Sequence, residues 1–347
     1  MKAAAFYAIG TIASLGAIAA ESAYARRKRN GWYDAADTIT NLNIGAGNVL
    51  TGLVLAAFVA AGYGWLYAHR VLEASARLPA WASFALAVLF ADFLQYWNHR
   101  LSHDVNVLWA GHITHHSSPH LNLSTGIRIN WLYRGYAWLL YAPMPLLGFS
   151  FESFVAAQAV IGTYNLFMHT RLRLPFGPLR RVLVTAESHG LHHSSDPRYF
   201  GNYGAALIVW DRLFGTYREL PAGVTLDDHP FGIGRAVGEN PLRLNVHYLV
   251  ELWRTAREES RSFVSLLLSP PAAGPALGGR HAAAREASVP FWMWLGLGIV
   301  AVATLAIQAA GMGAGPDDRA HVARIFGGIA LITFLGVALE RRVRNHR

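Results

Sequence analysis

The chain alternates long apolar runs with polar segments. The first run covers residues 3–20 and ends at Glu21, shortly before the basic cluster 26–29. Further runs lie at about 44–68, 80–98, 131–168, 289–311 and 321–339. Most of them approach the roughly 20 residues that a helix needs to cross a bilayer. The pattern predicts an all-α integral membrane protein in which a polar helical domain caps the transmembrane helices.

Two of these runs need closer interpretation. The run 131–168 contains Pro143 and Pro145 near its middle, which predicts a helical hairpin or a pair of shallow helices broken at the prolines. The run 3–20 resembles a signal peptide, because Ala23-Tyr24-Ala25 has the small residues of a cleavage site. A signal peptide carries its positive charge before the apolar core, whereas here the charge follows it. We therefore expect a retained helix.

The basic residues orient the predicted helices. Lys and Arg concentrate at 26–29 and 341–347, which the positive-inside rule places in the cytoplasm, with the N-terminus outside. The chain then reaches the cytoplasm again at residue 99 and at residue 169. Residues 270–288, rich in Pro, Gly and Ala, are typical of a linker. The expected organisation is N-terminal transmembrane helices (1–87), a core with a membrane hairpin (88–218), a polar cytoplasmic region with its linker (219–287) and a C-terminal transmembrane pair (288–347).

Composition supports this class. Of the 347 residues, 53% are hydrophobic and 15% are charged, whereas soluble domains carry about 25% charged residues. The chain has no cysteine, which excludes disulfides, iron–sulfur clusters and thiolate zinc sites. The net charge of +9 is explained by arginines that flank apolar spans and contact anionic headgroups. No nucleic-acid-binding motif accompanies the charge, so we expect no nucleic-acid partner.

Histidines form three clusters, spaced H-x3-H, H-x2-H-H and H-x2-H-H. They are His99 and His103, then His112, His115 and His116, then His189, His192 and His193. Residues at i, i+3 and i+4 share one face of a helix, so each cluster would present its imidazoles together. Eight imidazoles are enough for two metal ions. His169 stands alone between the second and third clusters, where a ligand and an ordinary core histidine are both open interpretations.

Two classes of metal-binding membrane protein fit the sequence poorly. A metal-transporting membrane protein would place His and Asp at mid-membrane, whereas these histidines lie at the ends of predicted spans. A metal-dependent lipid hydrolase would need a motif such as H-E-x-x-H, which the sequence lacks. Asp92 lies seven residues before His99, about two helical turns away. It could accept a hydrogen bond from a ligand imidazole or pair with another helix.

The histidines sit within longer family-like blocks. These are Leu108–His112, His115–Ser118, Asn122–Arg128, Tyr164–His169, Asn202–Gly204 and Trp210–Tyr217. Across about residues 88–218 the chain resembles the fatty acid hydroxylase / sterol desaturase superfamily of membrane di-metal oxygenases. Within it, the chain looks most similar to the alkylglycerol monooxygenase-like branch. Arg128 and Asp211 belong to these blocks, and for both we expect pairing within the cap.

The resemblance implies a ligand set and a cofactor. It makes metal ligands of His99, His103, His112, His115, His116, His169, His189, His192 and His193. It implies two Fe ions, with Zn possible on overexpression, and O2 as co-substrate. Asp104 stands where that branch tends to carry Glu, and with Asp92 it is a candidate catalytic carboxylate. Glu187 and Ser188 precede the third cluster where the branch often has Ser-His.

The resemblance also implies a reaction and its partners. We expect hydroxylation or desaturation of a C–H bond in a membrane lipid, with sterol, ether lipid, ornithine lipid and fatty acyl chain all open. The glycines 232, 234 and 238 lack the spacing of a dinucleotide fingerprint. A separate electron donor, such as a ferredoxin, cytochrome or reductase, is therefore expected. We expect the enzyme in a bacterial inner membrane, with its active site on the cytoplasmic side.

Overall fold

The computed structural model describes residues 2–73 and 78–271, which fold almost entirely into helices. The longer ones are α1 (Lys2–Lys28), α2 (Ala35–Ala68), α3 (Ala80–Asp104), α8 (Phe151–Met168) and α11 (Pro241–Glu258). The shorter α-helices are α4 (Asn106–Ala110), α5 (Ile113–His116), α6 (Tyr133–Tyr136), α7 (Pro143–Leu146), α9 (Ala186–His192), α10 (Val209–Leu213) and α12 (Phe263–Leu268). Single 3-10 turns are η1 (Thr125–Ile127), η2 (Ala137–Tyr141), η3 (Gly177–Arg181), η4 (Pro197–Tyr199) and η5 (Leu226–Asp228).

The predicted helical class is confirmed for this part of the chain. Its β-structure is limited to two isolated bridges, Leu183–Leu207 and Ser194–Phe231. The expected C-terminal spans at 289–311 and 321–339, and most of the expected linker, lie outside the described residues.

Helices α2 and α3 are long and apolar enough to span a membrane. Only 11% of the apolar window of α2 and 28% of that of α3 are buried inside the protein. A core helix of a soluble protein would be mostly buried. The exposed side chains are large and apolar, including Leu53 and Trp65 on α2 and Trp81 on α3. Such surfaces suit contact with lipid.

Both spans extend beyond the apolar runs that predicted them. Helix α2 begins at Ala35, nine residues before position 44. Its N-cap is Asp34, whose carboxylate accepts hydrogen bonds from the Ala36 and Asp37 N–H groups, both at 2.9 Å. Helix α3 continues past residue 98 to Asp104 and so carries the first histidine cluster in its last two turns. Hydropathy locates the lipid-facing part of each helix, whereas the helix itself ends where capping and backbone geometry stop it.

Residues 131–168 contain one long helix rather than two equal ones. The first half is divided among α6, η2 and α7, with Pro143 at the start of α7 and Gly148 at φ +87° after it. Helix α8 then starts at the Ser150 cap, whose hydroxyl accepts from the Ser153 N–H. The prolines thus break the run where expected.

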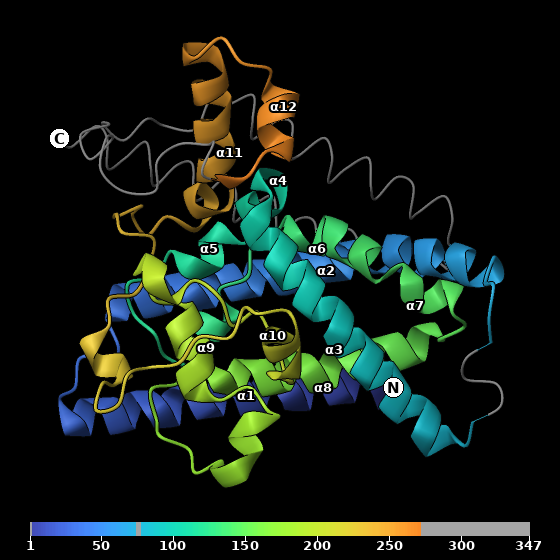
Figure 1. Cartoon of the computed structure of the whole chain (residues 1–347), viewed down its shortest axis with the longest axis horizontal. Helices are drawn as coiled ribbons and strands as arrows, with labels where there is room; N and C mark the ends of the chain where they lie inside the picture. Colours follow the sequence, from blue (N-terminus) through green and yellow to red (C-terminus); the bar gives the residue numbers. More distant parts are fainter. Residues whose placement is uncertain (1, 74–77, 272–347) are drawn as a thin grey trace, which may run out of the picture. The chain divides into compact units, whose positions relative to one another are not determined.

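Helices α3 and α8 pack closely against each other, and Figure 1 shows them crossing. The core there uses small side chains: Ala87 and Ala91 on α3 and Ala157 on α8 are fully buried. Small residues let two helix backbones approach, as is common between membrane helices. The packing brings the C-terminal ends of α3 and α8 toward the histidine-bearing loops.

The polar cap rests on α11, an amphipathic helix that contacts α4 and α5. Its apolar face buries Leu244 and Tyr248 against Trp109 and Ile113. The Thr114 hydroxyl donates to the Leu244 carbonyl at 2.7 Å. These contacts hold α5, which carries two histidines, from the side opposite α9.

Helix α1 is tied to the cap through Glu21. This buried carboxylate accepts hydrogen bonds from the Tyr33 hydroxyl at 2.5 Å, the Leu123 N–H at 2.8 Å and the Thr170 hydroxyl. The first apolar run forms a helix that continues through the basic cluster to Lys28. Glu21 therefore anchors the helix beside Thr170, the residue that follows His169.

Candidate metal centre

Four segments bring all nine predicted histidines together. His99 and His103 come from α3, His112–His116 from the start and body of α5, His169 from the end of α8, and His189–His193 from α9 and its C-cap. They form two groups, and the ligand nitrogens within each group lie within 4.8 Å of one another. One group contains His99, His103, His112, His116 and His192, and the other contains His115, His169, His189 and His193.

The group of five is joined through Nε2 atoms. His99 Nε2 lies 3.1 Å from His112 Nε2, which lies 3.0 Å from His116 Nε2. His192 Nε2 lies 3.1 Å from His116 Nε2. The buried Nε2 of His103 has no hydrogen-bond partner within the described residues. A buried imidazole nitrogen needs a partner, and one surrounded by other imidazole nitrogens is well suited to bind a metal ion.

The group of four has the same construction. His169 Nε2 lies 3.0 Å from His115 Nε2 and 2.9 Å from His189 Nε2. His193 Nε2 lies 3.3 Å from His189 Nε2. All four residues are almost fully buried. The site is therefore closed on this side, and its nitrogens converge on one point.

Backbone carbonyls fix the tautomer of three rings. The Nδ1–H of His99 donates to the Tyr203 carbonyl at 2.9 Å, and that of His192 donates to the Gly201 carbonyl at 2.7 Å. The Nδ1–H of His169 donates to the Asn165 carbonyl at 2.8 Å. Each ring then presents an unprotonated Nε2 to its group. Metal-bound histidines characteristically donate their other nitrogen in this way.

The nitrogens fit metal ions better than hydrogen bonds to each other. Lone pairs from several neutral imidazoles face one another at about 3 Å, which is repulsive unless a cation lies between them. Two nitrogens bound at about 2.0–2.1 Å lie roughly 2.9 Å apart on an octahedral ion and roughly 3.3 Å apart on a tetrahedral ion. The Nε2 separations of 2.9 to 3.3 Å fall in this interval. Residues of this chain can thus hold two metal ions.

Burial keeps these rings neutral. Loss of hydration lowers the pKa of His115, His189 and His193 well below its usual value, and neighbouring imidazoles lower it further. Burial also lowers the pKa of His169 to about 4, although its hydrogen bond to Asn165 opposes the shift. A neutral imidazole is the form that binds metal, so the cluster is ready to bind at neutral pH.

Only the group of five approaches the surface. His103 and His112 are half-buried, whereas the other seven rings are buried. The ring of His103 lies 4.9 Å from that of Trp109 and 5.2 Å from that of Tyr203, measured between centroids. These aromatic rings form the wall beside the exposed edge of the group.

The two candidate carboxylates lie in different surroundings. Asp92 is buried and accepts hydrogen bonds from the Ala206 N–H at 2.9 Å, the Leu207 N–H at 3.2 Å and the Trp210 indole at 2.8 Å. It thus holds the segment whose Gly201 and Tyr203 carbonyls orient two ligand rings. Asp104 is exposed and pairs with Arg100 at 3.6 Å. Among the described contacts, neither carboxylate touches a histidine of the cluster.

Sequence reasoning did not identify the carbonyl acceptors. A backbone carbonyl leaves no mark on the sequence, because any residue supplies one. Asn165 alone was predictable, since it precedes His169 by one helical turn. Asp211 was singled out only as part of a family-like block, and its carboxylate fixes the same loop by accepting from the Tyr203 and Gly204 N–H groups.

Comparison with known proteins identifies the region that carries this site. Residues 84–216 match the family model for fatty acid hydroxylases. These residues form a fatty acid hydroxylase domain. The domain contains all nine histidines and the three residues whose carbonyls orient His99, His169 and His192, so the family match and the buried cluster describe the same part of the chain.

Several relatives are similar over a wider region. An alkylglycerol monooxygenase from Xenopus tropicalis is 31% identical over 249 residues, which are 69% of this chain and 53% of the relative. One from Danio rerio is 37% identical over 186 residues, 52% of this chain and 40% of the relative. An ornithine lipid hydroxylase from Rhizobium tropici is 31% identical over 144 residues, 41% and 44% of the two chains. The chain spans about half the length of these relatives, and no solved structure shows significant similarity to it.

The similarity confirms both the superfamily and the alkylglycerol monooxygenase-like branch. The departures from that branch lie outside the two histidine groups of the hydroxylase domain. Asp104 is exposed at the end of α3. Glu187 is exposed, and Ser188 completes a capping box with Thr185 at the start of α9. Neither departure therefore changes a member of the two ligand groups.

Proposed function

We propose that this protein is a membrane-bound di-iron oxygenase that hydroxylates or desaturates a C–H bond of a membrane lipid. The observation that carries the proposal is the division of nine buried imidazoles into two convergent groups within a fatty acid hydroxylase domain. One iron would be held by the group of five and the other by the group of four. Zn can occupy such imidazole sites on overexpression.

Bound iron would supply the activation of O2 that no amino-acid side chain can provide. The residues of this chain would keep the ligand nitrogens unprotonated, fix ring orientation through the Gly201, Tyr203 and Asn165 carbonyls, and keep water away from the group of four. Asp92 would act as a positioning residue for the loop with two of those carbonyls. We propose separately that Asp104, which pairs with Arg100 at the end of α3, takes part in the reaction.

The substrate proposal rests on what the relatives have in common. Their names include alkylglycerol monooxygenase, ornithine lipid hydroxylase, fatty acid hydroxylase and sterol desaturase, so each acts on a lipid. The apolar exposed faces of α2 and α3 would place the domain beside a leaflet. We propose a membrane lipid rather than a soluble metabolite, with sterol, ether lipid, ornithine lipid and acyl chain as the candidates.

The reaction needs electrons from a partner. Hydroxylation of R–H by O2 gives R–OH and water and consumes two electrons and two protons, and desaturation gives two waters with the same requirement. We propose a separate ferredoxin, cytochrome or reductase as the donor. We further propose an inner-membrane location with the metals on the cytoplasmic side, and a division of the chain at about residues 87, 218 and 287.

The experiment combines metal analysis with lipid analysis. Protein from iron-supplemented cells should contain about two iron ions per chain. Mass spectrometry of lipids from cells with and without the gene should show one lipid class shifted by the mass of an oxygen atom or by the loss of two hydrogens. The His189→Ala and His112→Ala variants should lose iron and the product, whereas His69→Ala, at an exposed position, should keep both.

The alternative is a histidine-rich metal transporter. It would bind metal and move it across vesicle membranes without consuming O2. Metal uptake into proteoliposomes, together with unchanged lipid masses in cells, would therefore overturn the oxygenase proposal.

A further inference from the structure

A cavity of about 800 Å³ lies on the outer side of α9, away from the histidines. Its walls are the segment 171–181, the first residues of α9 and the segment 217–227. Glu187, Ser188 and Leu191 face it from α9, whereas His189 and His192 of the same helix belong to the metal groups. One helix therefore separates this cavity from the metal centre.

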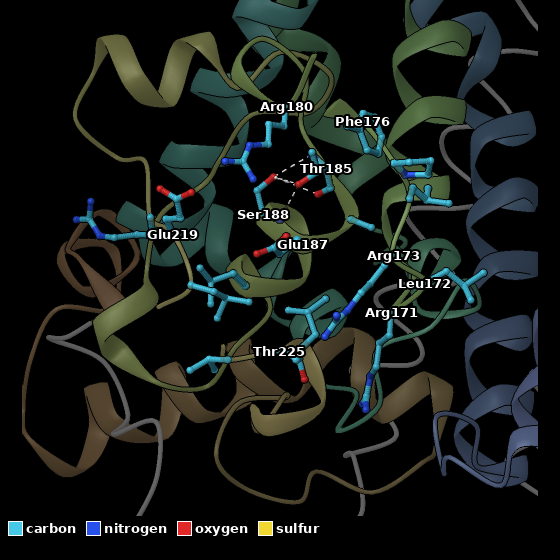
Figure 2. Close-up of a pocket in the computed structure, with 18 of the residues that line it drawn as sticks. Arg171, Leu172, Arg173, Phe176, Arg180, Thr185, Glu187, Ser188, Glu219 and Thr225 are labelled. Carbon is cyan, nitrogen blue, oxygen red and sulfur yellow. Dashed lines mark hydrogen bonds between the residues drawn. The ribbon is translucent and has the colours of Figure 1, made fainter. Parts of the chain in front are cut away.

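Arginines dominate the charged groups of this cavity. Arg171, Arg173, Arg180, Arg181 and Arg218 line it, against three acidic side chains. Figure 2 shows Arg180 reaching the side of Ser188 and Arg173 extending from another part of the wall toward Thr225.

Part of this positive charge is already compensated. The Arg171 guanidinium lies 3.3 Å from the Asp227 carboxylate and over the Phe231 ring. Arg218 donates to the Gly215 and Tyr217 carbonyls. By contrast, Arg173, Arg180 and Arg181 take part in no ion pair within residues 2–73 and 78–271. Guanidinium groups that outnumber the nearby carboxylates and form no ion pair with them favour a phosphate or carboxylate ligand, which they bind through paired N–H groups.

The floor of the cavity is apolar. Leu191, Leu220 and Leu226 line it and belong to one buried cluster with Phe231. A cationic rim above an apolar floor matches an amphiphile better than a fully polar solute. The volume is within the range of sites that bind small ligands, and it exceeds what a free phosphate ion would fill.

The segment 171–182, most of which lines the cavity, also carries exposed apolar side chains. Leu174, Leu179 and Val182 have relative exposures of 44%, 56% and 46%. They are interleaved in sequence with Arg173, Arg180 and Arg181. Segments that lie at a membrane surface combine apolar side chains, which enter the headgroup boundary, with arginines that contact anionic lipids.

We propose that this cavity binds the phosphate-bearing headgroup of an anionic membrane lipid, while Leu174 and Leu179 enter the adjacent leaflet. Arg173 and Arg180 contact the phosphate, and the leucine floor receives the apolar part next to it. The site is distinct from the metal centre and does not depend on the reaction proposed there.

The test measures ligand binding to the full chain in a neutral detergent by isothermal titration calorimetry. The probes are dihexanoyl phosphatidylglycerol below its micellar concentration, glycerol 3-phosphate and uncharged dihexanoylglycerol. We expect about one phosphatidylglycerol per chain, bound more tightly than either other probe. The double variant Arg173→Gln/Arg180→Gln should weaken that binding about tenfold or more, because two charge-assisted hydrogen bonds are lost.

Two further variants separate the contributions. Leu174→Ser/Leu179→Ser should weaken binding of the full chain to vesicles that contain phosphatidylglycerol but leave glycerol 3-phosphate binding unchanged. Arg243→Gln, which removes an arginine of α11 that does not line the cavity, should change neither. The altered cavity residues are exposed, so iron content and melting temperature should match wild type and show that each variant is folded.

Three results would overturn the proposal. Unchanged lipid binding in the arginine variant would show that the cavity is not the site. Equal affinity for glycerol 3-phosphate and the lipid, with no effect of the leucine variant, would indicate a soluble anion as ligand. If the arginine variant binds the lipid normally but its irons are no longer reduced by an acidic ferredoxin, the cavity is a docking surface for the electron donor instead. Because binding is measured without turnover, failure of the oxygenase proposal would leave this result interpretable.

Discussion

Arg128 forms an ion pair with Asp37 at 3.1 Å, and the two side chains are only 2% and 5% exposed. The same guanidinium donates to the Asn41 side chain at 2.7 Å, to the Thr114 carbonyl at 2.9 Å and to the Ser117 hydroxyl. Asp37 and Asn41 belong to α2, whereas Thr114 and Ser117 flank His115 and His116. A buried charge outside the metal site thus fixes α5 to a candidate membrane helix.

Removing this cation should destabilise the protein strongly. In Arg128→Gln the Asp37 carboxylate would remain buried without its partner, so we expect the free energy of unfolding to fall by about 3–5 kcal/mol. Iron content should fall as well, because the α5 backbone loses its support. Thermal unfolding and metal analysis in detergent would measure both effects.

An exposed pair of the same chemistry provides the control. Arg198 lies 2.5 Å from Asp196, but its side chain is 78% exposed. Arg198→Gln should therefore change stability by less than about 1 kcal/mol. Similar shifts in the two variants would show that burial of the Arg128 pair has no special importance.

Gly201 should not tolerate a side chain. A Cβ at this position would lie 2.2 Å from the Thr216 carbonyl oxygen, so the backbone must move. The Gly201 carbonyl is the acceptor for His192 Nδ1–H, and its displacement should release that ring. We expect Gly201→Ala to lose metal from the group of five, and with it most of the activity. Mössbauer or absorption spectroscopy of the iron-loaded variant would report the altered ligand set.

A second glycine separates this effect from the general consequences of substitution. Gly162 on α8 is exposed, and a Cβ added there would meet no atom within 4 Å among the described residues. Gly162→Ala should keep its iron and gain a few tenths to about 1 kcal/mol of stability through helix propensity. Metal loss in both variants would argue against the specific role of Gly201.

The metal-free protein should become unstable in mild acid. Burial lowers the pKa of His169 to about 4 and those of His115 and His189 well below the usual value, whereas the unfolded chain titrates near 6.5. Below about pH 6.5 the unfolded state binds more protons than the folded state, so the free energy of unfolding decreases as the pH is lowered. Each ring that stays neutral in the folded state lowers the free energy of unfolding by about 1.4 kcal/mol for each pH unit below 6.5, until its folded pKa is reached.

Melting temperatures of chelator-treated protein between pH 8 and pH 5 would measure this dependence. We expect little change down to about pH 7 and a steep decline below about pH 6.5. The iron-loaded protein should resist further, because bound metal excludes the proton until it dissociates. A metal-free protein whose stability is flat from pH 7 to pH 5 would show that these rings are not buried in the neutral form.

The histidine spacing predicted which residues meet but not how they divide. Neighbours in sequence go to different groups: His115 and His116 separate, and so do His192 and His193. Successive residues of a helix point about 100° apart, so a pair of adjacent histidines can face two metals at once. The spacing alone could not reveal this, because the division depends on where α3 and α8 place their own rings.

Helix ends were predictable only where side chains mark them. Hydropathy placed the end of a span near residue 98, yet α3 continues to Asp104, because histidine and arginine are compatible with a helix while being poorly apolar. The prolines at 143 and 145 marked the short helix α7, and the break before α8 follows it at Gly148. The packing of Arg128 on Asp37 joins residues 91 positions apart, which no local pattern encodes.

Asp92 should act by holding the loop that carries the Gly201 and Tyr203 carbonyls. Its carboxylate accepts three hydrogen bonds, from the Ala206 and Leu207 N–H groups and the Trp210 indole. Asparagine has one acceptor oxygen and a donor amide, so Asp92→Asn should leave donors unpaired and reduce stability by about 1–3 kcal/mol. As a positioning residue, Asp92 should affect activity through iron content, and turnover per bound iron should stay near that of wild type. Asp104→Asn is the matched comparison, since its exposed side chain should leave stability unchanged and any loss of turnover per iron would then report a role in the reaction. If Asp92→Asn instead keeps its iron and melting temperature while turnover per iron falls about a hundredfold or more, the carboxylate takes part in proton transfer, and the positioning role is wrong.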